Sequence, residues 1–105
     1  MRVTTVVDYG IVNLRNILRG LEHVGAKVEV TDNPDRLLKA DRVILPGVGA
    51  FAAGMAELGS RDLDQALIEI AAVGRPVLGI CLGMQMLLET STENGRHQGL
   101  GLIPG

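Results

Sequence analysis

Aromatic residues and cysteine are scarce in this sequence of 105 residues. It has no tryptophan, one tyrosine, one phenylalanine and one cysteine, although 47% of its residues are hydrophobic. The core must therefore be built from aliphatic side chains. A single cysteine excludes an internal disulfide and fits the reducing cytoplasm, where we expect the protein to lie. The length suits one compact domain and is too short for two.

Charge of either sign is also limited. Twelve acidic and ten basic residues leave a net charge of -2, so the basic surface typical of nucleic-acid-binding proteins is missing. No apolar run approaches the ~20 residues that a membrane span needs. The first residues meet a charge too early to form a signal peptide. We therefore expect neither nucleic acid nor a membrane as a partner.

Short apolar segments that predict β-strands alternate with segments of helical periodicity. The strands are expected at residues 2–8, 26–31, 42–45 and 76–80. The helices are expected around residues 14–21, 34–38, 52–58, 63–71 and 82–89. Because apolar and β-branched residues dominate these strands, and because the strands alternate with helices, the sequence predicts an α/β fold with an open, mostly parallel sheet and helices on both faces.

Local signals refine these boundaries. Asn33 before Pro34 predicts a helix N-cap, and Ser60 or Asp62 is expected to cap the helix that begins near residue 63. Residues 91–99 are polar and predict a loop. Residues 100–105 resemble the approach to another strand. We therefore expect the chain to be the N-terminal portion of a longer domain.

Glycines gather where three of the predicted strands end. The chain has fourteen glycines, and the strand ends are residues 8–10, 46–49 and 79–83. In open α/β sheets, ligands bind at the carboxyl ends of the strands. These three segments are therefore the candidate site.

Cys81 lies where a strand passes directly into a helix, with Gly79 and Gly83 two residues away on either side. This is the pattern of a nucleophile elbow, in which a strained turn leaves no room for neighbouring side chains. The turn places the sulfur at a helix N-terminus, which favours a thiolate. It also aims the backbone N–H of Leu82 at a developing oxyanion. The alternative is a small buried cysteine without chemistry.

Two further features adjoin this elbow. Gln85 shares a helical face with Cys81 and either recognises a polar substrate or simply meets solvent. The loop at residues 46–49 either ends a strand or presents backbone N–H groups to a ligand. His23 and His97 are well separated from each other and form no metal site of usual spacing with Cys81. We expect neither a metal nor a cofactor.

Taken together, these motifs resemble those of class I glutamine amidotransferases. Residues 79–85, Gly-Ile-Cys-Leu-Gly-Met-Gln, resemble the nucleophile motif, and residues 46–51 resemble the oxyanion strand. Residues 8–10, followed by Asn13, are similar to the glutaminase subunits of imidazole glycerol phosphate synthases, and Met84 favours the same group. The resemblance covers all 105 residues and implies the N-terminal part of one flavodoxin-like amidotransferase domain.

The resemblance implies a function for this site. Cys81 would attack the side-chain amide of glutamine, and the N–H groups of Leu82 and of Val48 or Gly49 would stabilise the oxyanion once the strand reorganises. The residues implied to hold the substrate are Gly47, Gly49, Gln85 and Glu93. The ammonia would pass to a (β/α)8 cyclase subunit, in a heterodimer that serves histidine biosynthesis. The partner-facing residues implied are Tyr9, Gly10, Asn13 and Asn16.

The family also uses a His-x-Glu motif, which neither His23 nor His97 matches. A nucleophile without its base loses most of its rate, so we expect this chain alone to be inactive. Two alternatives remain open. One is another class I amidotransferase or a cysteine-elbow hydrolase, and the other is a non-catalytic flavodoxin-like docking module.

Overall fold

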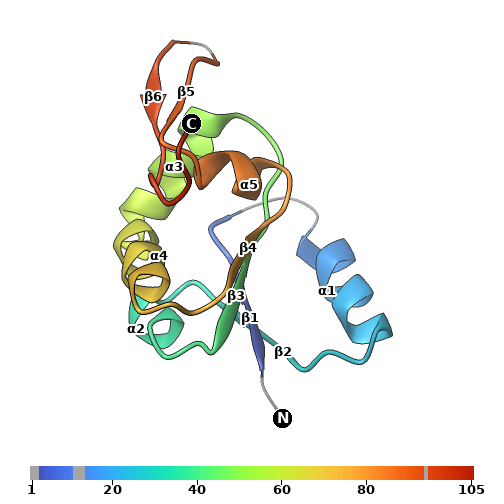
Figure 1. Ribbon diagram of the computed structural model, residues 1–105. Helices are drawn as coiled ribbons and strands as arrows, with labels where there is room; N and C mark the ends of the chain where they lie inside the picture. The colour runs from blue at the N-terminus through green and yellow to red at the C-terminus, as the bar shows by residue number, and fades with distance from the viewer. Residues whose placement is uncertain (1–2, 11–13, 94) are drawn as a thin grey trace.

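The computed structural model describes residues 3–10, 14–93 and 95–105 and contains a four-stranded parallel sheet. The strands lie in the order β2-β1-β3-β4 (Figure 1). Their bounds are Thr4–Val7 for β1, Val28–Thr31 for β2, Arg42–Leu45 for β3 and Val77–Gly79 for β4. The predicted parallel α/β fold is confirmed. The third strand has the predicted bounds, and the other three are shorter than predicted.

Helices cover both faces of this sheet, as the sequence predicts. Figure 1 shows α1 on one side of the sheet, with α2 and α4 on the other. The helices are α1 (Leu14–His23), α2 (Pro34–Leu37), α3 (Phe51–Ser60), α4 (Leu63–Ala72) and α5 (Leu82–Met86). In the part of the chain that the structure describes, no helix has the length and apolar character needed to cross a membrane.

The main core lies on the face of the sheet that α2, α3 and α4 cover. Val7, Val43 and Leu45 from the strands join this core. The helices contribute fully buried leucines and isoleucine, namely Leu37, Leu58, Leu63, Leu67 and Ile70. On the other face, no residue of α1 is fully buried, and Leu78 of β4 is 57% exposed. The molecule therefore packs one face of its sheet much more completely than the other.

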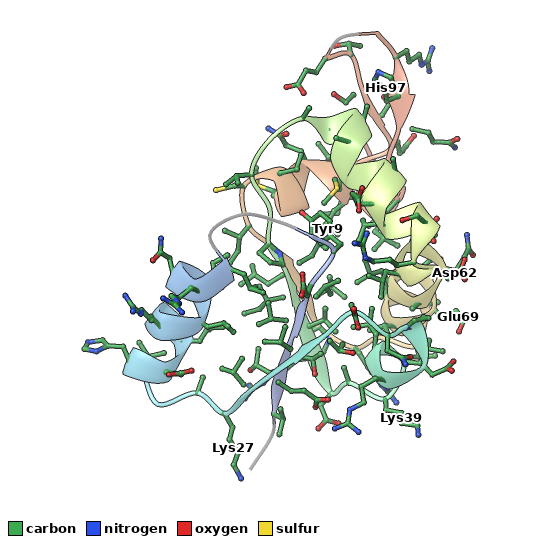
Figure 2. All side chains as sticks on the ribbon, turned by 180° about the vertical axis from the view of Figure 1, so that it is seen from behind. Tyr9, Lys27, Lys39, Asp62, Glu69 and His97 are labelled. Atoms are coloured by element: carbon green, nitrogen blue, oxygen red, sulfur yellow. The ribbon has the colours of Figure 1, made fainter. Side chains whose placement is uncertain are left out.

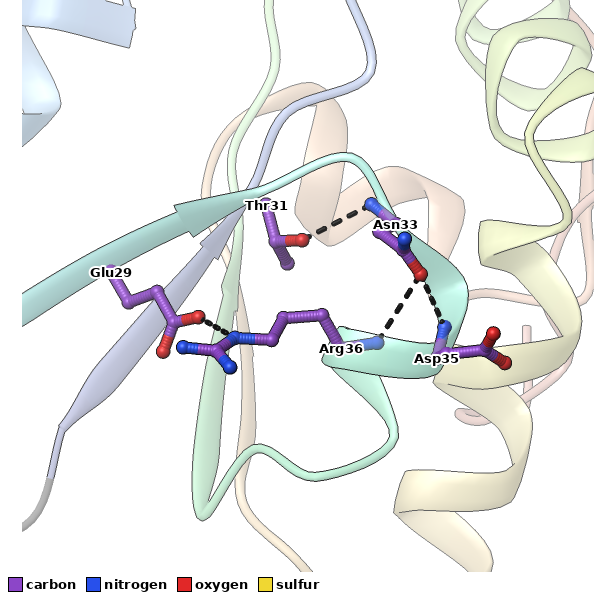
Figure 3. A network of polar contacts seen from close by, with 5 residues as sticks. All are labelled: Glu29, Thr31, Asn33, Asp35 and Arg36. Carbon is purple, nitrogen blue, oxygen red and sulfur yellow. Dashed lines mark hydrogen bonds and ion pairs between the residues drawn. The ribbon is translucent and has the colours of Figure 1, made fainter.

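The start of α2 follows the capping pattern of the sequence. Asn33 is the N-cap and Pro34 the first helical residue, and the Asn33 side chain accepts hydrogen bonds from the N–H groups of Asp35 (2.8 Å) and Arg36 (3.4 Å). Figure 3 shows this cap and the ion pair between Arg36 and Glu29 that ties α2 to β2. A short polar side chain before Pro is thus a reliable start signal here.

The start of α4 differs from its prediction. Asp62 occupies the N-cap position, but its backbone is left-handed, with φ 57° and ψ 21°, and its side chain makes no cap hydrogen bond. Ser60 instead ends α3, and its hydroxyl donates to the Glu57 carbonyl. The predicted side-chain cap is wrong because α3 and α4 almost abut, so the chain turns sharply at Asp62 instead of entering the helix from an extended segment.

The predicted loop at residues 91–99 is also partly wrong. Strands β5 (Thr90–Ser91) and β6 (His97–Gln98) pair antiparallel in a small hairpin that projects beyond α5 (Figure 1). These strands are two residues long and polar, so they have no apolar alternation that the sequence could reveal. Beyond them, Ile103 forms a single parallel bridge with Leu88.

Candidate active site

Cys81 lies at the junction of β4 and α5 in a backbone conformation that side chains rarely adopt. Its φ is 54° and its ψ is -118°. Among the described residues, Cys81 and Asp62 are the two non-glycine residues with positive φ. The cysteine is exposed, so it is not the small buried hydrophobe of the alternative interpretation. A strained and accessible nucleophile-type residue is the arrangement that the elbow pattern predicts.

Only glycine fits at positions 79 and 83, on either side of Cys81, because a side chain there would collide with backbone atoms. A Cβ at Gly79 would lie 2.6 Å from the Cα of Met84 and 2.7 Å from its backbone nitrogen. A Cβ at Gly83 would overlap the carbonyl oxygen of Leu45 and lie 2.7 Å from its carbonyl carbon. All of these neighbours are backbone atoms, which cannot turn aside as a flexible side chain can. The elbow therefore needs glycine at both positions.

Backbone hydrogen bonds tie the elbow to the end of β3. The N–H of Ile80 donates to the Leu45 carbonyl and the N–H of Leu82 donates to the Gly47 carbonyl, each at 3.0 Å. Leu82 is the predicted oxyanion donor, and its N–H is thus engaged by the facing loop in this conformation. The sequence did not indicate this contact, because it joins residues 35 positions apart along the chain.

The facing loop, residues 46–49, combines a crowded glycine with an open one. A Cβ at Gly47 would overlap the Tyr9 hydroxyl and lie 3.1 Å from the Cβ of Leu82. Gly49 has φ +114° and no atom within 4 Å of its Cβ position. Val48 between them is 49% exposed. Position 47 therefore requires glycine because no side chain fits beside Tyr9, and position 49 favours glycine because its φ is positive.

Tyr9 connects the end of β1 to this loop. Its side chain is only 1% exposed and its hydroxyl donates a hydrogen bond to the Pro46 carbonyl. Burial raises the pKa of Tyr9 well above its usual value, so the hydroxyl keeps its proton. Figure 2 shows the Tyr9 side chain pointing into the interior near α3 and α5.

The expected partner surface is only partly available. Tyr9 is buried within this chain, so its side chain cannot meet a partner in this conformation. Gly10 and Asn16 are exposed, and Asn13 lies outside the described residues. Gly10 borders the ion pair of Glu57 and Arg61 on α3 and the turn that follows it. This pair was not singled out in the sequence, because nothing local links it to the end of β1.

Glu93 and Gln85 approach the site from different elements. The Glu93 carboxylate accepts a hydrogen bond of 3.2 Å from the Phe51 N–H, at the first residue of α3. Ala50, the N-cap of α3, supplies no side-chain cap, so a carboxylate 42 residues away caps this helix. Glu93 thereby lies beside the segment that follows Gly49. Gln85 is exposed on α5, one turn after Cys81.

A cavity of about 190 Å³ adjoins the loop at residues 46–49. Its lining has residues from all three glycine-rich strand ends and from α3, namely Tyr9, Gly10, Val48, Gly49, Ala50, Ala53, Gly54, Glu57 and Leu82. Cys81 is not part of this lining. The loop at residues 46–49 therefore lines the cavity through Val48 and Gly49, and its Gly47 carbonyl accepts the N–H of Leu82, the residue after the nucleophile.

The two histidines lie on other elements. His23 is exposed in the last turn of α1, and His97 lies in β6 on the projecting hairpin (Figure 2). Among residues 3–10, 14–93 and 95–105, no three His, Cys, Asp or Glu side chains gather as metal ligands. The chemistry available in the described residues is therefore that of Cys81, the backbone N–H groups and the polar side chains near them.

Comparison with known proteins agrees with this arrangement. The family model described as glutamine amidotransferase class-I matches residues 5–99. The chain is 50% identical over 103 residues to the imidazole glycerol phosphate synthase subunit HisH of Salinibacter ruber, covering 98% of this chain and 47% of that protein. It is 50% identical over 105 residues to the subunit of the same name from Moorella thermoacetica, covering 100% of this chain and 50% of that protein.

The chain spans about half the length of these curated relatives. Among solved structures, it is similar to a putative peptidase E protein from Listeria monocytogenes EGD-e, with a TM-score of 0.76 and 19% identity. This match covers 97% of the chain and 63% of that structure. At this level of identity the likeness supports the fold alone.

Proposed function

Because the chain belongs to the class-I glutamine amidotransferase family, we propose that it carries the nucleophile and the oxyanion strand of a glutaminase. The observation that carries this proposal is Cys81, an exposed cysteine with positive φ between two glycines that no other residue can replace. The strained turn makes a nucleophile accessible and fixes its direction of attack. For an inert cysteine the same strain would only lower stability.

The proposed reaction has two steps. The Cys81 thiolate attacks the side-chain amide carbon of glutamine, which forms a C–S bond and a tetrahedral oxyanion. The oxyanion then collapses, the C–N bond breaks, and the nitrogen takes a proton and leaves as ammonia. Water hydrolyses the remaining glutamyl thioester to glutamate and regenerates the thiol. The proton donor in the family is the histidine of the His-x-Glu motif, which matches no position in this chain.

The oxyanion hole requires one peptide of the facing loop to rotate. The Gly47 carbonyl now accepts the Leu82 N–H. In a trans peptide the carbonyl and the following N–H point in opposite directions, so the Val48 N–H points away from Leu82. Rotation of the Gly47–Val48 peptide would free the Leu82 N–H and turn the Val48 N–H toward the same point. Two donors aimed at one oxygen form an oxyanion hole, and the absence of neighbours around Gly49 supports such a movement.

Glutamine would be held around this centre by polar groups from three elements. Gly47 and Gly49 permit close approach of the backbone, and Gln85 follows Cys81 by one helical turn. Glu93 lies beside the loop through its bond to the Phe51 N–H. Its carboxylate is suited to the α-amino group of the substrate.

We further propose that the ammonia is delivered to a cyclase subunit of an imidazole glycerol phosphate synthase in the cytoplasm. About 50% identity over nearly the whole chain to subunits of that name supports this role in histidine biosynthesis. The exposed residues Gly10 and Asn16, together with Asn13, are the proposed docking residues. Because the family's base matches no residue here, the 105-residue chain by itself is proposed to be inactive.

The test replaces Cys81 in the full-length protein, assayed together with its cyclase partner. Cys81→Ala is expected to abolish glutamine-dependent synthesis, by at least a thousandfold, while synthesis from added ammonia continues unchanged. Loss of both activities would mean that Cys81 is structural. Retention of glutamine use would refute the nucleophile assignment, and hydrolysis of small esters in preference to glutamine would favour a cysteine-elbow hydrolase instead.

A further inference from the structure

Two neighbouring carbonyl groups of the loop at residues 46–49 are held by two different parts of the molecule. The Pro46 carbonyl accepts the Tyr9 hydroxyl, which comes from the end of β1. The Gly47 carbonyl accepts the Leu82 N–H, which comes from the start of α5. The first bond uses a side chain and the second uses the backbone group that the proposed oxyanion hole needs.

Only one of these two hydrogen bonds has to break when the oxyanion hole forms. The Pro46 carbonyl belongs to the Pro46–Gly47 peptide, whereas the Gly47 carbonyl belongs to the next peptide. Rotation of the Gly47–Val48 peptide must break the Leu82 bond, because it moves the carbonyl that accepts it. The same rotation leaves the Pro46 carbonyl in place. The Tyr9 bond can therefore persist through the movement as a fixed point.

Tyr9 is itself held firmly enough to act as a fixed point. Its side chain is 1% exposed and belongs to the main core together with Val7, Phe51 and Leu82. Its hydroxyl also sits against Gly47, where a Cβ would overlap it. The ring cannot swing away without opening the core, and the hydroxyl keeps its proton because the site is buried.

We propose that Tyr9 is a positioning residue of the oxyanion strand: by holding the Pro46 carbonyl, it confines the movement to the Gly47–Val48 peptide and sets the direction in which the Val48 N–H arrives. This inference rests on the proposed glutaminase function for its kinetic consequence. Its structural consequence does not depend on that function: the Pro46 carbonyl is held fixed, directly next to the Gly47 carbonyl that accepts the Leu82 N–H.

The kinetic test is Tyr9→Phe in the full-length protein with its cyclase partner. The variant keeps the ring that packs in the core and removes only the hydroxyl. A net hydrogen bond of ordinary strength corresponds to a three- to tenfold effect. We expect kcat for glutamine hydrolysis to fall ~3- to 10-fold with KM unchanged, because the strand is misplaced in the transition state and not in substrate binding. Synthesis from added ammonia is expected to stay at the wild-type rate.

The structural test is amide hydrogen exchange at Leu82, measured by NMR in the same protein. If Tyr9 anchors the loop, its hydroxyl also steadies the Gly47 carbonyl that protects this N–H. Exchange at Leu82 is then expected to quicken by ~3- to 10-fold in Tyr9→Phe. The matched control is Thr31→Val, which removes another largely buried hydroxyl at a strand end, one that accepts the Asn33 N–H. Thr31→Val is expected to change neither exchange at Leu82 nor kcat.

A conservative replacement guards against simple loss of folding. 3-Fluorotyrosine installed at position 9 retains both the ring and the hydroxyl donor, and we expect it to keep wild-type kcat and Leu82 exchange. An unchanged kcat in Tyr9→Phe, a raised kcat, or a fluorotyrosine protein as slow as Tyr9→Phe would each overturn the proposal. Unchanged Leu82 exchange would also overturn it. Faster exchange in a protein whose wild type hydrolyses no glutamine would leave the anchor standing and refute the proposed function.

Discussion

The nucleophile elbow and the loop that faces it are held in place by different kinds of force. At the elbow, Gly79 and Gly83 touch backbone atoms so closely that no side chain fits. In the loop, Gly49 has open space around it, and the carbonyls of Pro46 and Gly47 are held by single hydrogen bonds. Packing against backbone is rigid, whereas a hydrogen bond contributes only about 1 kcal/mol net. The nucleophile is thus fixed, and the oxyanion donor of the facing loop, the Val48 N–H, can move.

The largest expected effect comes from breaking the packing at the elbow. Gly83→Ala would place a Cβ against the Leu45 carbonyl, which forces α5 away from β3. We expect the free energy of unfolding to fall by about 3 kcal/mol, measured by urea denaturation. The matched control is Gly20→Ala in α1, where a Cβ meets nothing within 4 Å. It is expected to stabilise the protein by about 0.5–1 kcal/mol. Equal stability of the two variants would show that the elbow is not sterically fixed.

A smaller effect is expected from relieving the strain at the nucleophile itself. Cys81 adopts φ 54° and ψ -118°, which glycine tolerates and alanine does not. Cys81→Gly is therefore expected to exceed Cys81→Ala in free energy of unfolding by about 1–2 kcal/mol. Thermal denaturation of the two proteins side by side measures this difference. If alanine proves as stable as glycine, Cys81 carries no backbone strain.

The smallest expected effect concerns the open end of the loop. Gly49→Ala meets no neighbour, so its cost is limited to the backbone strain of φ +114°, about 1 kcal/mol of unfolding free energy. Because the same residue gives the oxyanion strand its freedom, we expect kcat for glutamine hydrolysis in the full-length protein to fall about tenfold, with folding retained. A stability loss as large as that of Gly83→Ala would mean that the loop is packed like the elbow, and the contrast between the two regions would fail.

Signals that lie close together in the sequence predicted much of the fold. Asn33 with Pro34 placed the start of α2, and the apolar run of residues 43–45 between Arg42 and Pro46 placed β3 at its observed bounds. The steric need for Gly79 and Gly83 also followed from the pattern around Cys81, because a strand-to-helix turn crowds its own neighbours.

Features that depend on contacts between distant segments could not be predicted in this way. The Tyr9 hydroxyl reaches Pro46, and the Glu93 carboxylate reaches Phe51, across 37 and 42 residues. The left-handed turn at Asp62 was missed for another reason, because it follows from how closely α4 follows α3. The hydrogen bond from the Leu82 N–H to the Gly47 carbonyl is a further contact between distant segments. Local propensity does not report such contacts, since they exist only once the sheet has brought the strand ends together.

The most direct measurement of the central claim is covalent labelling of the full-length protein with a diazoketone analogue of glutamine. A nucleophilic thiolate at a glutamine site displaces dinitrogen from this reagent and forms a stable thioether. We predict one adduct by intact mass, located on Cys81 by peptide mapping, prevented by excess glutamine and absent from Cys81→Ala. Labelling at another residue, or no labelling of the folded wild-type protein, would contradict the assignment of Cys81 as the nucleophile of a glutaminase.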